Sequence, residues 1–293
     1  QQMFSRNRGD VTLPTTVNCG DVSEPVPAGC IGVGTWNTQA EFKDIKVTAP
    51  DGKILFQSDF STNAAGWKLL GDGAQWSVRD GALRQSAEKT FIRALAGNRT
   101  WEDYTLELKA RKIAGAEGFL ILFHINSDSD RTWWNIGGWG NTRDALEMGS
   151  GAVDGKESHI ETGRWYDIKL EVNGRAVKCW LDGQLIHNFR KPIQTTRAIY
   201  ASAARDENEN SVIIKVVNTA SFPIDTEIAL DGVNELSGAA TATTLTSASP
   251  SDENSIDNPT NISPTMQTFN VSSPDFHRKF PGNSFTVLRL PLK

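Results

Sequence analysis

The sequence contains little cysteine, no long apolar run and no excess of positive charge, and each of these absences excludes a class of protein. Its three cysteines are an odd number, which rules out a complete internal disulfide framework. No apolar stretch approaches the roughly 20 residues of a membrane-spanning helix. The net charge of −5 provides no basic surface for a nucleic acid. We therefore expect a globular protein with no nucleic-acid partner and no membrane partner.

Motifs of common catalytic and metal sites are also missing. The sequence has no CxxC, HExxH, GxSxG or Walker motif, and its four histidines lack metal-ligand spacing. We interpret His124, His159 and His187 as structural residues. Cys19 and Cys30 either pair across the loop between them, which would suit an oxidising compartment, or remain free thiols.

Strand patterns dominate what is present. Residues 105–111 alternate between apolar and polar, as a half-buried strand does, and residues 118–125 (GFLILFHI) suit a central strand. Residues 165–189 contain Asn173-Gly174 and Asp182-Gly183, dipeptides that favour two-residue hairpin turns, so we predict a three-stranded antiparallel meander there. No long segment shows helical periodicity. Many short strands with frequent turns predict an all-β protein built from β-sandwiches.

A change in composition marks a domain boundary near residues 190–192. All nine tryptophans lie between Trp36 and Trp180, and none follows. A length of 293 residues also suits two domains. The opening residues, QQMFSRNRGD, lack the apolar core of a signal peptide, and we expect the chain to be part of a longer protein.

The last third of the chain resembles the C-terminal β-sandwich of the α-L-arabinofuranosidases of glycoside hydrolase family 51. The segments that carry this resemblance keep the family's order and spacing: residues 199–232 (beginning IYASAARDENEN), 243–264 (beginning TTLTSASPSDEN) and 280–290 (FPGNSFTVLRL). The opening QQMFSRNRGDVTLPTT resembles the point where the family's catalytic barrel ends and the next strand of the sandwich begins. The resemblance implies that residues 1–30 and residues 191–293 belong to one sandwich.

The middle of the chain, residues 31–190, resembles a concanavalin-like jelly roll, the fold of laminin-G modules, many lectins and the 3-keto-disaccharide hydrolase domain. The stretches GTWNTQAEFKDIKV, ILFQSDFS and TWWNIGGWGNTR carry this second resemblance. Together the two resemblances imply a jelly roll inserted into an arabinofuranosidase C-terminal sandwich.

The first resemblance also implies a function. Family 51 catalysis uses two glutamates on a (β/α)8 barrel, and nothing in this sequence matches those glutamate motifs, so we assign no catalytic residue. The chain is then the non-catalytic, carbohydrate-binding or accessory part of an arabinofuranosidase that acts on arabinoxylan or arabinan. Its partners would be a polysaccharide or oligosaccharide and the barrel of the parent enzyme. The family implies a secreted or periplasmic bacterial protein that requires no cofactor.

The stretch TWWNIGGWGNTR, residues 132–143, is the candidate ligand site, because indole faces pack on sugar C–H groups while amides and guanidinium groups bind hydroxyls. Successive strand residues point to opposite faces, so one of Trp133 and Trp134 should lie in the core. Glycines flank Trp139, which favours it as an exposed stacking platform. The predicted carbohydrate-binding residues are Trp133, Trp134, Asn135, Trp139, Asn141, Arg143 and Glu147. We expect the other tryptophans to be core residues: Trp36, Trp67, Trp76, Trp101, Trp165 and Trp180.

Two alternative functions remain open at this point. An independent glycoside hydrolase in the jelly roll would need paired carboxylates, and Glu147 with Asp144 or Glu157 with Glu161 are the candidates, although the E-x-D-x-E signature of jelly-roll hydrolases is absent. A purely structural or oligomerisation module would bind no glycan.

A structural Ca²⁺ ion is a further alternative. The stretches NSDSD (126–130) and SDEN (251–254) offer oxygen ligands, but both are also ordinary turn compositions.

Overall fold

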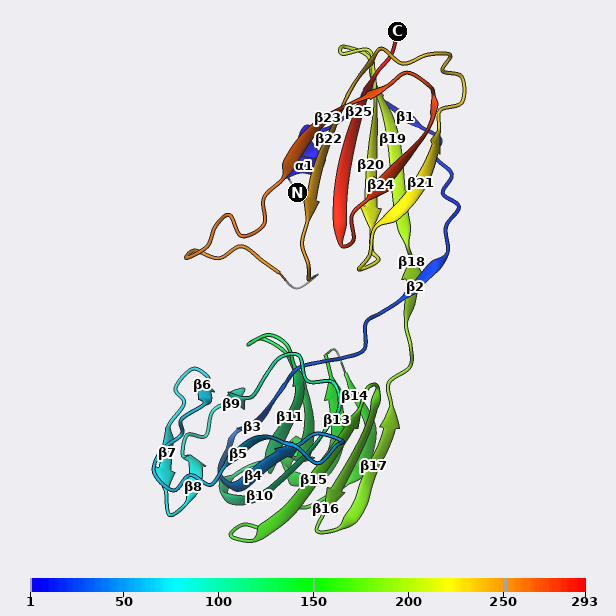
Figure 1. The fold of residues 1–293 in the computed structure, drawn as a ribbon. Helices are drawn as coiled ribbons and strands as arrows, with labels where there is room; N and C mark the ends of the chain where they lie inside the picture. The colour runs from blue at the N-terminus through cyan, green and yellow to red at the C-terminus, as the bar shows by residue number, and fades with distance from the viewer. Residues whose placement is uncertain (1, 150, 250–251) are drawn as a thin grey trace. The chain divides into compact units, whose positions relative to one another are not determined.

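The computed structural model describes residues 2–149, 151–249 and 252–293, and its regular secondary structure is almost entirely β-strand, as predicted (Figure 1). Within these residues the helices are the short α1 (Gln2–Arg6) and the four-residue α2 (Gly138–Asn141). The chain forms two compact units. The jelly-roll unit is Pro25–Pro192, and the two-ended unit combines the residues up to Glu24 with Ile193–Lys293. These units divide the chain close to the predicted boundaries of 30/31 and 190/191.

The jelly-roll unit contains two antiparallel sheets. The first sheet has the order β17-β16-β15-β10-β4-β8-β7, with β5 paired to β4. Its strands are β4 (Thr38–Thr48), β5 (Ile54–Ser58), β7 (Trp76–Arg79), β8 (Ala82–Gln85), β10 (Tyr104–Gly115), β15 (Trp165–Asn173), β16 (Ala176–Leu181) and β17 (Gln184–Arg190). The second sheet has the order β14-β13-β12-β11-β3-β9-β6. Its strands are β3 (Cys30–Thr35), β6 (Trp67–Leu70), β9 (Ile92–Ala96), β11 (Phe119–Ile125), β12 (Thr132–Gly137), β13 (Arg143–Met148) and β14 (Ala152–Glu157).

The predicted meander corresponds to β15, β16 and β17, although its first turn lies one residue later than expected. Asn173 pairs with Ala176, so the loop residues are Gly174 and Arg175, and Gly174 has a φ of 53°. This position is the first central residue of the hairpin, where a positive φ favours glycine. The second turn, at Asp182 and Gly183, is where the dipeptide predicts it.

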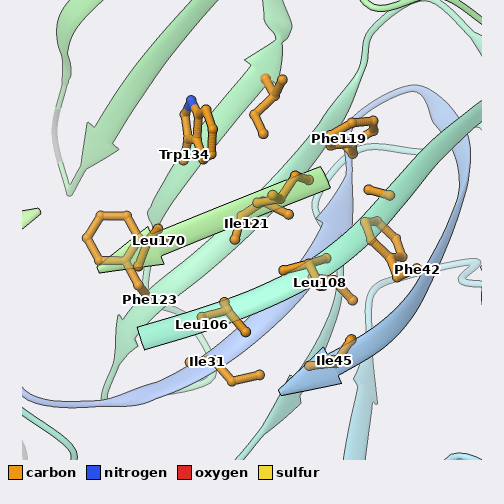
Figure 2. Close-up of a cluster of buried hydrophobic side chains, with 14 of the residues drawn as sticks. Ile31, Phe42, Ile45, Leu106, Leu108, Phe119, Ile121, Phe123, Trp134 and Leu170 are labelled. Atoms are coloured by element: carbon orange, nitrogen blue, oxygen red, sulfur yellow. The ribbon is translucent and has the colours of Figure 1, made fainter. Parts of the chain in front are cut away.

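The core of the jelly roll lies between the two sheets, and residues that alternate along the strands supply it (Figure 2). Phe42 of β4, Phe119 and Ile121 of β11 and Trp134 of β12 are fully buried there. A smaller apolar cluster lies on the opposite face of the second sheet and includes Trp133. The second sheet is therefore packed on both faces, and this second cluster forms the base of the candidate site.

The two-ended unit is built around a six-stranded antiparallel sheet of order β1-β19-β20-β25-β22-β23. Two smaller ladders, β2 with β18 and β21 with β24, complete the unit. The bounds are β1 (Val11–Leu13), β2 (Asp21–Ser23), β18 (Thr195–Arg197), β19 (Ile199–Asp206), β20 (Ser211–Asn218), β21 (Ile224–Ala229), β22 (Gly238–Thr246), β23 (Thr265–Val271), β24 (Asp275–Phe280) and β25 (Ser284–Pro291). Strands from both ends of the chain thus pair with each other, since β1 pairs with β19.

The three cysteines are free thiols, so the paired alternative for Cys19 and Cys30 is not what the structure shows. Cys19 belongs to the two-ended unit and Cys30 to the jelly-roll unit. Burial raises the pKa of the Cys30 thiol above its usual value, which disfavours the reactive thiolate.

Candidate functional site

A cavity of about 350 Å³ lies on the outer face of the second sheet of the jelly roll, the face turned away from the core. The antiparallel pairing of β11 with both β3 and β12 explains why the lining residues meet. The end of β3, the start of β11 and the end of β12 lie at one edge, because Gly34 pairs with Leu120 and Phe119 pairs with Ile136. The lining residues are Trp36, Glu117, Leu120, Arg131, Trp133, Asn135, Trp139, Glu147, Gly149 and Gly151.

The base of the cavity is a hydrogen-bonded group on β12 and β13. Trp133 and Asn135 are alternate residues of β12, and Glu147 lies opposite Trp133 in the register. The Oε1 atom of Glu147 accepts hydrogen bonds from Trp133 Nε1 at 2.9 Å and from Asn135 Nδ2 at 2.8 Å. No group in the described part of the chain is recorded as donating to Oε2. The carboxylate is therefore held in place with one oxygen open to a ligand donor.

One wall of the cavity is the indole of Trp139 in α2. This side chain is 43% exposed, in contrast to the buried Trp133 and Trp134. The guanidinium carbon of Arg143 lies 5.1 Å from the centroid of the Trp139 ring, in a cation–π arrangement. Arg143 thus stacks on the platform rather than lining the cavity.

Glu117, another lining residue of the cavity, is a titratable group with a shifted pKa. Burial raises the pKa of its carboxyl above the usual range, and the nearby charge of Glu147 acts in the same direction. Hydrogen bonds from the backbone N–H groups of Gly140 and Trp139, together with the positive charge of Lys112, oppose this shift. Shifted carboxyl groups that face a cavity are frequent at functional sites.

Four of the seven predicted site residues line this cavity, namely Trp133, Asn135, Trp139 and Glu147. Trp134 does not, because it faces the core with no exposed surface and its Nε1 donates to Asp144. Asn141 is also buried, and its side chain forms hydrogen bonds with the nearby backbone. Its Nδ2 donates to Ile160 O at 2.9 Å, and its Oδ1 accepts from Ile160 N at 2.8 Å. Trp134 and Asn141 are therefore buried away from the cavity, whereas Arg143 is exposed and does not line it.

Sequence reasoning missed Trp36, Glu117, Leu120 and Arg131 as lining residues. Trp36 was expected in the core because it follows a strand pattern. It reaches the cavity because β3 pairs with β11, a partner far away in sequence. The sequence does contain one sign of this crowded face, because Gly32 and Gly34 alternate along β3. A Cβ atom at either position would lie within 2.7 Å of a carbonyl oxygen of β9. Small residues on one strand face indicate a crowded surface there.

Of the carboxylate pairs considered for an independent hydrolase, Asp144 and Glu147 lie on opposite faces of the second sheet. Leu146 lies in the core, and strand alternation places Asp144 on that same face and Glu147 on the other. Asp144 instead contacts the buried His187, whose Nδ1 lies 2.9 Å from Asp154 Oδ2. Glu161 binds Arg164 at 3.1 Å.

The NSDSD stretch uses its carboxylates within the protein. Asp128 pairs with Lys68 and Arg99, and Asp130 accepts the backbone N–H groups of Asn126 and Ser127. Residues 2–149, 151–249 and 252–293 contain no cluster of three or more His, Cys, Asp or Glu side chains suited to a metal ion. Of the second stretch, residue 251 lies outside the described residues.

A second cavity, of about 480 Å³, lies on the first sheet of the jelly roll. Its lining contains one tryptophan, Trp180, over which Lys169 Nζ lies at 4.7 Å from the ring centroid. Lys109 and Asp167 form an ion pair on the same surface. This cavity has one tryptophan where the cavity on the second sheet has three, so it is a weaker candidate.

Comparisons with known proteins find a family model and a curated relative to which the chain is similar. Residues 55–216 match the model of a family described as the 3-keto-alpha-glucoside-1,2-lyase-like domain. The chain is 38% identical, over 300 residues, to an extracellular exo-alpha-L-arabinofuranosidase of Streptomyces chartreusis. This similarity covers 99% of the chain and 35% of that protein, so the chain spans about a third of its relative.

Solved structures show a partial likeness. A GH51 arabinofuranosidase from Xanthomonas axonopodis pv. citri has 21% identity and a TM-score of 0.30, covering 39% of this chain and 23% of that one. The thermostable GH51 alpha-L-arabinofuranosidase from Thermotoga petrophila has 21% identity and a TM-score of 0.29, covering 40% and 26%. In the described part of the chain, no helix has the length and apolar character needed to cross a membrane.

Proposed function

We propose, on the premise that the chain belongs to the 3-keto-alpha-glucoside-1,2-lyase-like domain family, that its jelly-roll unit binds carbohydrate as a non-catalytic accessory part of a larger arabinofuranosidase. The observation that carries this proposal is the cavity of the second sheet. It gathers Trp36, Trp133 and Trp139 around a carboxylate whose second oxygen is open.

This arrangement has the two components that sugar recognition requires. A pyranose or furanose ring presents C–H groups that pack on an aromatic face and hydroxyls that need fixed polar partners. The sugar would stack on the face of Trp139 opposite Arg143. Glu147 Oε2 would accept a hydroxyl proton, and Arg131 would donate to a neighbouring oxygen. A cavity of this size, about 350 Å³, falls at the small end of ligand pockets.

The ligand class in this proposal follows from the relative. Because the similar Streptomyces chartreusis protein is named an extracellular exo-alpha-L-arabinofuranosidase, we propose an arabinose-containing polysaccharide such as arabinoxylan or arabinan. The partner would be a (β/α)8 catalytic domain of the same protein, and the protein would be secreted or periplasmic. No cofactor is part of the proposal.

The direct test is calorimetry of the 293-residue chain with arabinoxylan, arabinan and their oligosaccharides. Trp139→Ala should weaken binding by about 1–3 kcal/mol, which is roughly 5- to 150-fold in affinity. Trp180→Ala, on the first sheet, is the matched control and should leave affinity unchanged. If the wild-type chain binds none of these glycans, or if both variants weaken binding equally, the proposal is wrong.

A second candidate function is glycoside-cleaving chemistry in the same cavity. The observation that favours it is that two carboxyl groups, Glu117 and Glu147, line one cavity and that the pKa of Glu117 is raised. Release of sugar from arabinoxylan or an aryl arabinofuranoside by the chain alone, with its loss in Glu147→Gln, would distinguish this function from binding.

A further inference from the structure

Hydrogen bonds fix the backbone on both sides of Glu117. Glu117 N donates to the hydroxyl oxygen of the buried Thr38 at 3.0 Å. The preceding residue, Ala116, donates its N–H to Asn37 O at 2.9 Å. The following residue, Gly118, donates to Gly137 O at 2.8 Å. The turn that carries Glu117 is thus joined directly to the segment that carries Trp139.

The segment of residues 137–141 needs contacts that hold it in place, because its backbone conformation is energetically unfavourable. Gly137, Trp139, Gly140 and Asn141 have φ values of 66°, 50°, 73° and 64°. Glycine adopts this left-handed region readily, but for a bulky side chain such as Trp139 it costs roughly 1–2 kcal/mol. A residue remains in this conformation only where its surroundings hold it there.

Two side chains hold the segment. On its C-terminal side, Asn141 exchanges hydrogen bonds with the backbone of Ile160. In its middle, the backbone N–H groups of Trp139 and Gly140 lie close enough to the Glu117 carboxylate to lower its pKa. Because the carboxylate is charged, it attracts these N–H groups more strongly than a neutral acceptor would.

We propose that Glu117 is a positioning residue, whose carboxylate holds the 137–141 segment so that the Trp139 indole forms a wall of the cavity. The inference rests on the proposed function for its consequence in binding, but the structural coupling between Glu117 and Trp139 stands independently. Glu117 thereby controls ligand affinity through Trp139, whether or not it touches the sugar.

The coupling makes binding dependent on pH. Protonated Glu117 is a weaker acceptor, so the two backbone N–H groups lose their charged partner and the unfavourable segment relaxes. Because burial and Glu147 raise the pKa of Glu117, this change occurs closer to neutral pH than for an ordinary glutamate. Lys112, on β10, opposes the shift.

Two other groups face this region. Arg131 lines the same cavity. His159 contacts Asn141 through its Nδ1 atom, at 3.2 Å from Asn141 Nδ2.

The experiment combines amide NMR with calorimetry on the full 293-residue chain between about pH 4 and pH 8. In the wild type, the backbone amide resonances of Trp139 and Gly140 should titrate together with Glu117, and arabino-oligosaccharide affinity should fall as Glu117 is protonated. Glu117→Gln retains a carbonyl acceptor and should abolish both pH responses. Glu117→Ala should weaken binding by about tenfold at pH 7.

Two matched variants serve as controls. Glu107→Gln removes a carboxylate from the first sheet, and His159→Gln removes the imidazole that contacts Asn141. Both should preserve the response of the Trp139 and Gly140 amides in the acid range. Amides that do not follow Glu117 overturn the inference, and so does unchanged affinity in Glu117→Ala. If the amides titrate but no glycan binds at any pH, the positioning role stands and the proposed function fails.

Discussion

Trp133 and Trp134 are adjacent in sequence and lie on opposite faces of one sheet. The indole of Trp134 is enclosed between the two sheets of the jelly roll, whereas Trp133 belongs to the apolar cluster beneath the cavity. Each indole N–H has its own carboxylate, Asp144 for Trp134 and Glu147 for Trp133. A single strand thus supplies one tryptophan to stability and one to the candidate site.

Trp134 of β12 and Trp139 of α2 should differ sharply when each is replaced by alanine. Trp134→Ala opens a core cavity and should lower the free energy of unfolding by about 3–5 kcal/mol. Trp139→Ala removes an exposed side chain and should change it by less than about 0.5 kcal/mol. Urea denaturation of the two variants measures this difference. A large destabilisation in Trp139→Ala would mean that this residue is part of the fold rather than of the site.

Glu147→Gln should weaken glycan binding without unfolding the protein. The amide oxygen of glutamine still accepts from Trp133 and Asn135, but the charged acceptor for the sugar hydroxyl is lost. Hydrogen bonds to charged groups contribute about 1.5–3 kcal/mol, so affinity should fall by roughly 10- to 150-fold in calorimetry. The wild-type chain alone should release no sugar from an aryl arabinofuranoside. Turnover that survives repurification and disappears in Glu147→Gln would contradict this expectation.

Asp144 should make the jelly roll less stable as the pH rises. Burial raises its pKa, against the opposing hydrogen bonds from His187 and Trp134. Because the folded-state pKa exceeds the unfolded one, the ionised carboxylate destabilises the fold, and this cost grows as the pH rises from the unfolded pKa through the folded pKa. Asp144→Asn should therefore raise the Tm near pH 7 and leave it almost unchanged near pH 3, values on either side of the usual range for aspartate at about 3.9.

Asp154 should show the opposite sign. Burial acts to raise its pKa, but hydrogen bonds from His187 and Lys156 outweigh burial, so its pKa is lowered. Its contribution to stability is present above the unfolded pKa and is lost as the pH falls through the folded pKa. Asp154→Asn should thus lower the Tm at neutral pH, with a difference that vanishes in acid. The same sign for both variants in a pH series of melting curves would refute this pair of predictions.

Removal of divalent cations should not affect the protein. Asp128 and Asp130, the carboxylates of the NSDSD stretch, are already engaged by Lys68, Arg99 and local backbone N–H groups. Melting temperature and glycan affinity measured with EDTA should equal those measured with added Ca²⁺. A Ca²⁺-dependent rise in melting temperature would reveal a structural ion.

The two-ended unit should fold without the jelly roll. Glu24 N donates to Gln194 O at 2.9 Å, so the two cut ends lie side by side and a short linker can join them. In contrast, residues 193–293 alone lose strands β1 and β2 and should be less stable. Circular dichroism of both fragments decides the question. A stable 193–293 fragment would show that the first strands contribute little to this unit.

Local features of the fold were predictable, because their causes lie within a few residues. The Asp182-Gly183 turn has φ values of 49° and 79°, which that dipeptide tolerates well. The Asn173-Gly174 turn moved by one residue because the register places glycine at the first loop position. Alternation along β12 likewise predicted that one of its paired tryptophans would be buried.

The cavity itself was only partly predictable. Trp133, Asn135 and Glu147 are close in sequence through the β12–β13 hairpin, so a local motif captured them. Trp36 and Glu117 join them only because β11 lies between β3 and β12, and no local pattern specifies that strand order. Asn141 and Arg143 do not line the cavity, because the same chemical groups that bind sugars also bond to a backbone or stack on an indole.

The distribution of tryptophan gives the protein a built-in spectroscopic reporter. All nine indoles belong to the jelly-roll unit, and the two-ended unit has none. Fluorescence excited selectively in the indole band therefore follows the jelly roll alone, while far-ultraviolet circular dichroism follows both units. If the two signals change at different denaturant concentrations, the jelly-roll unit and the two-ended unit unfold independently of each other.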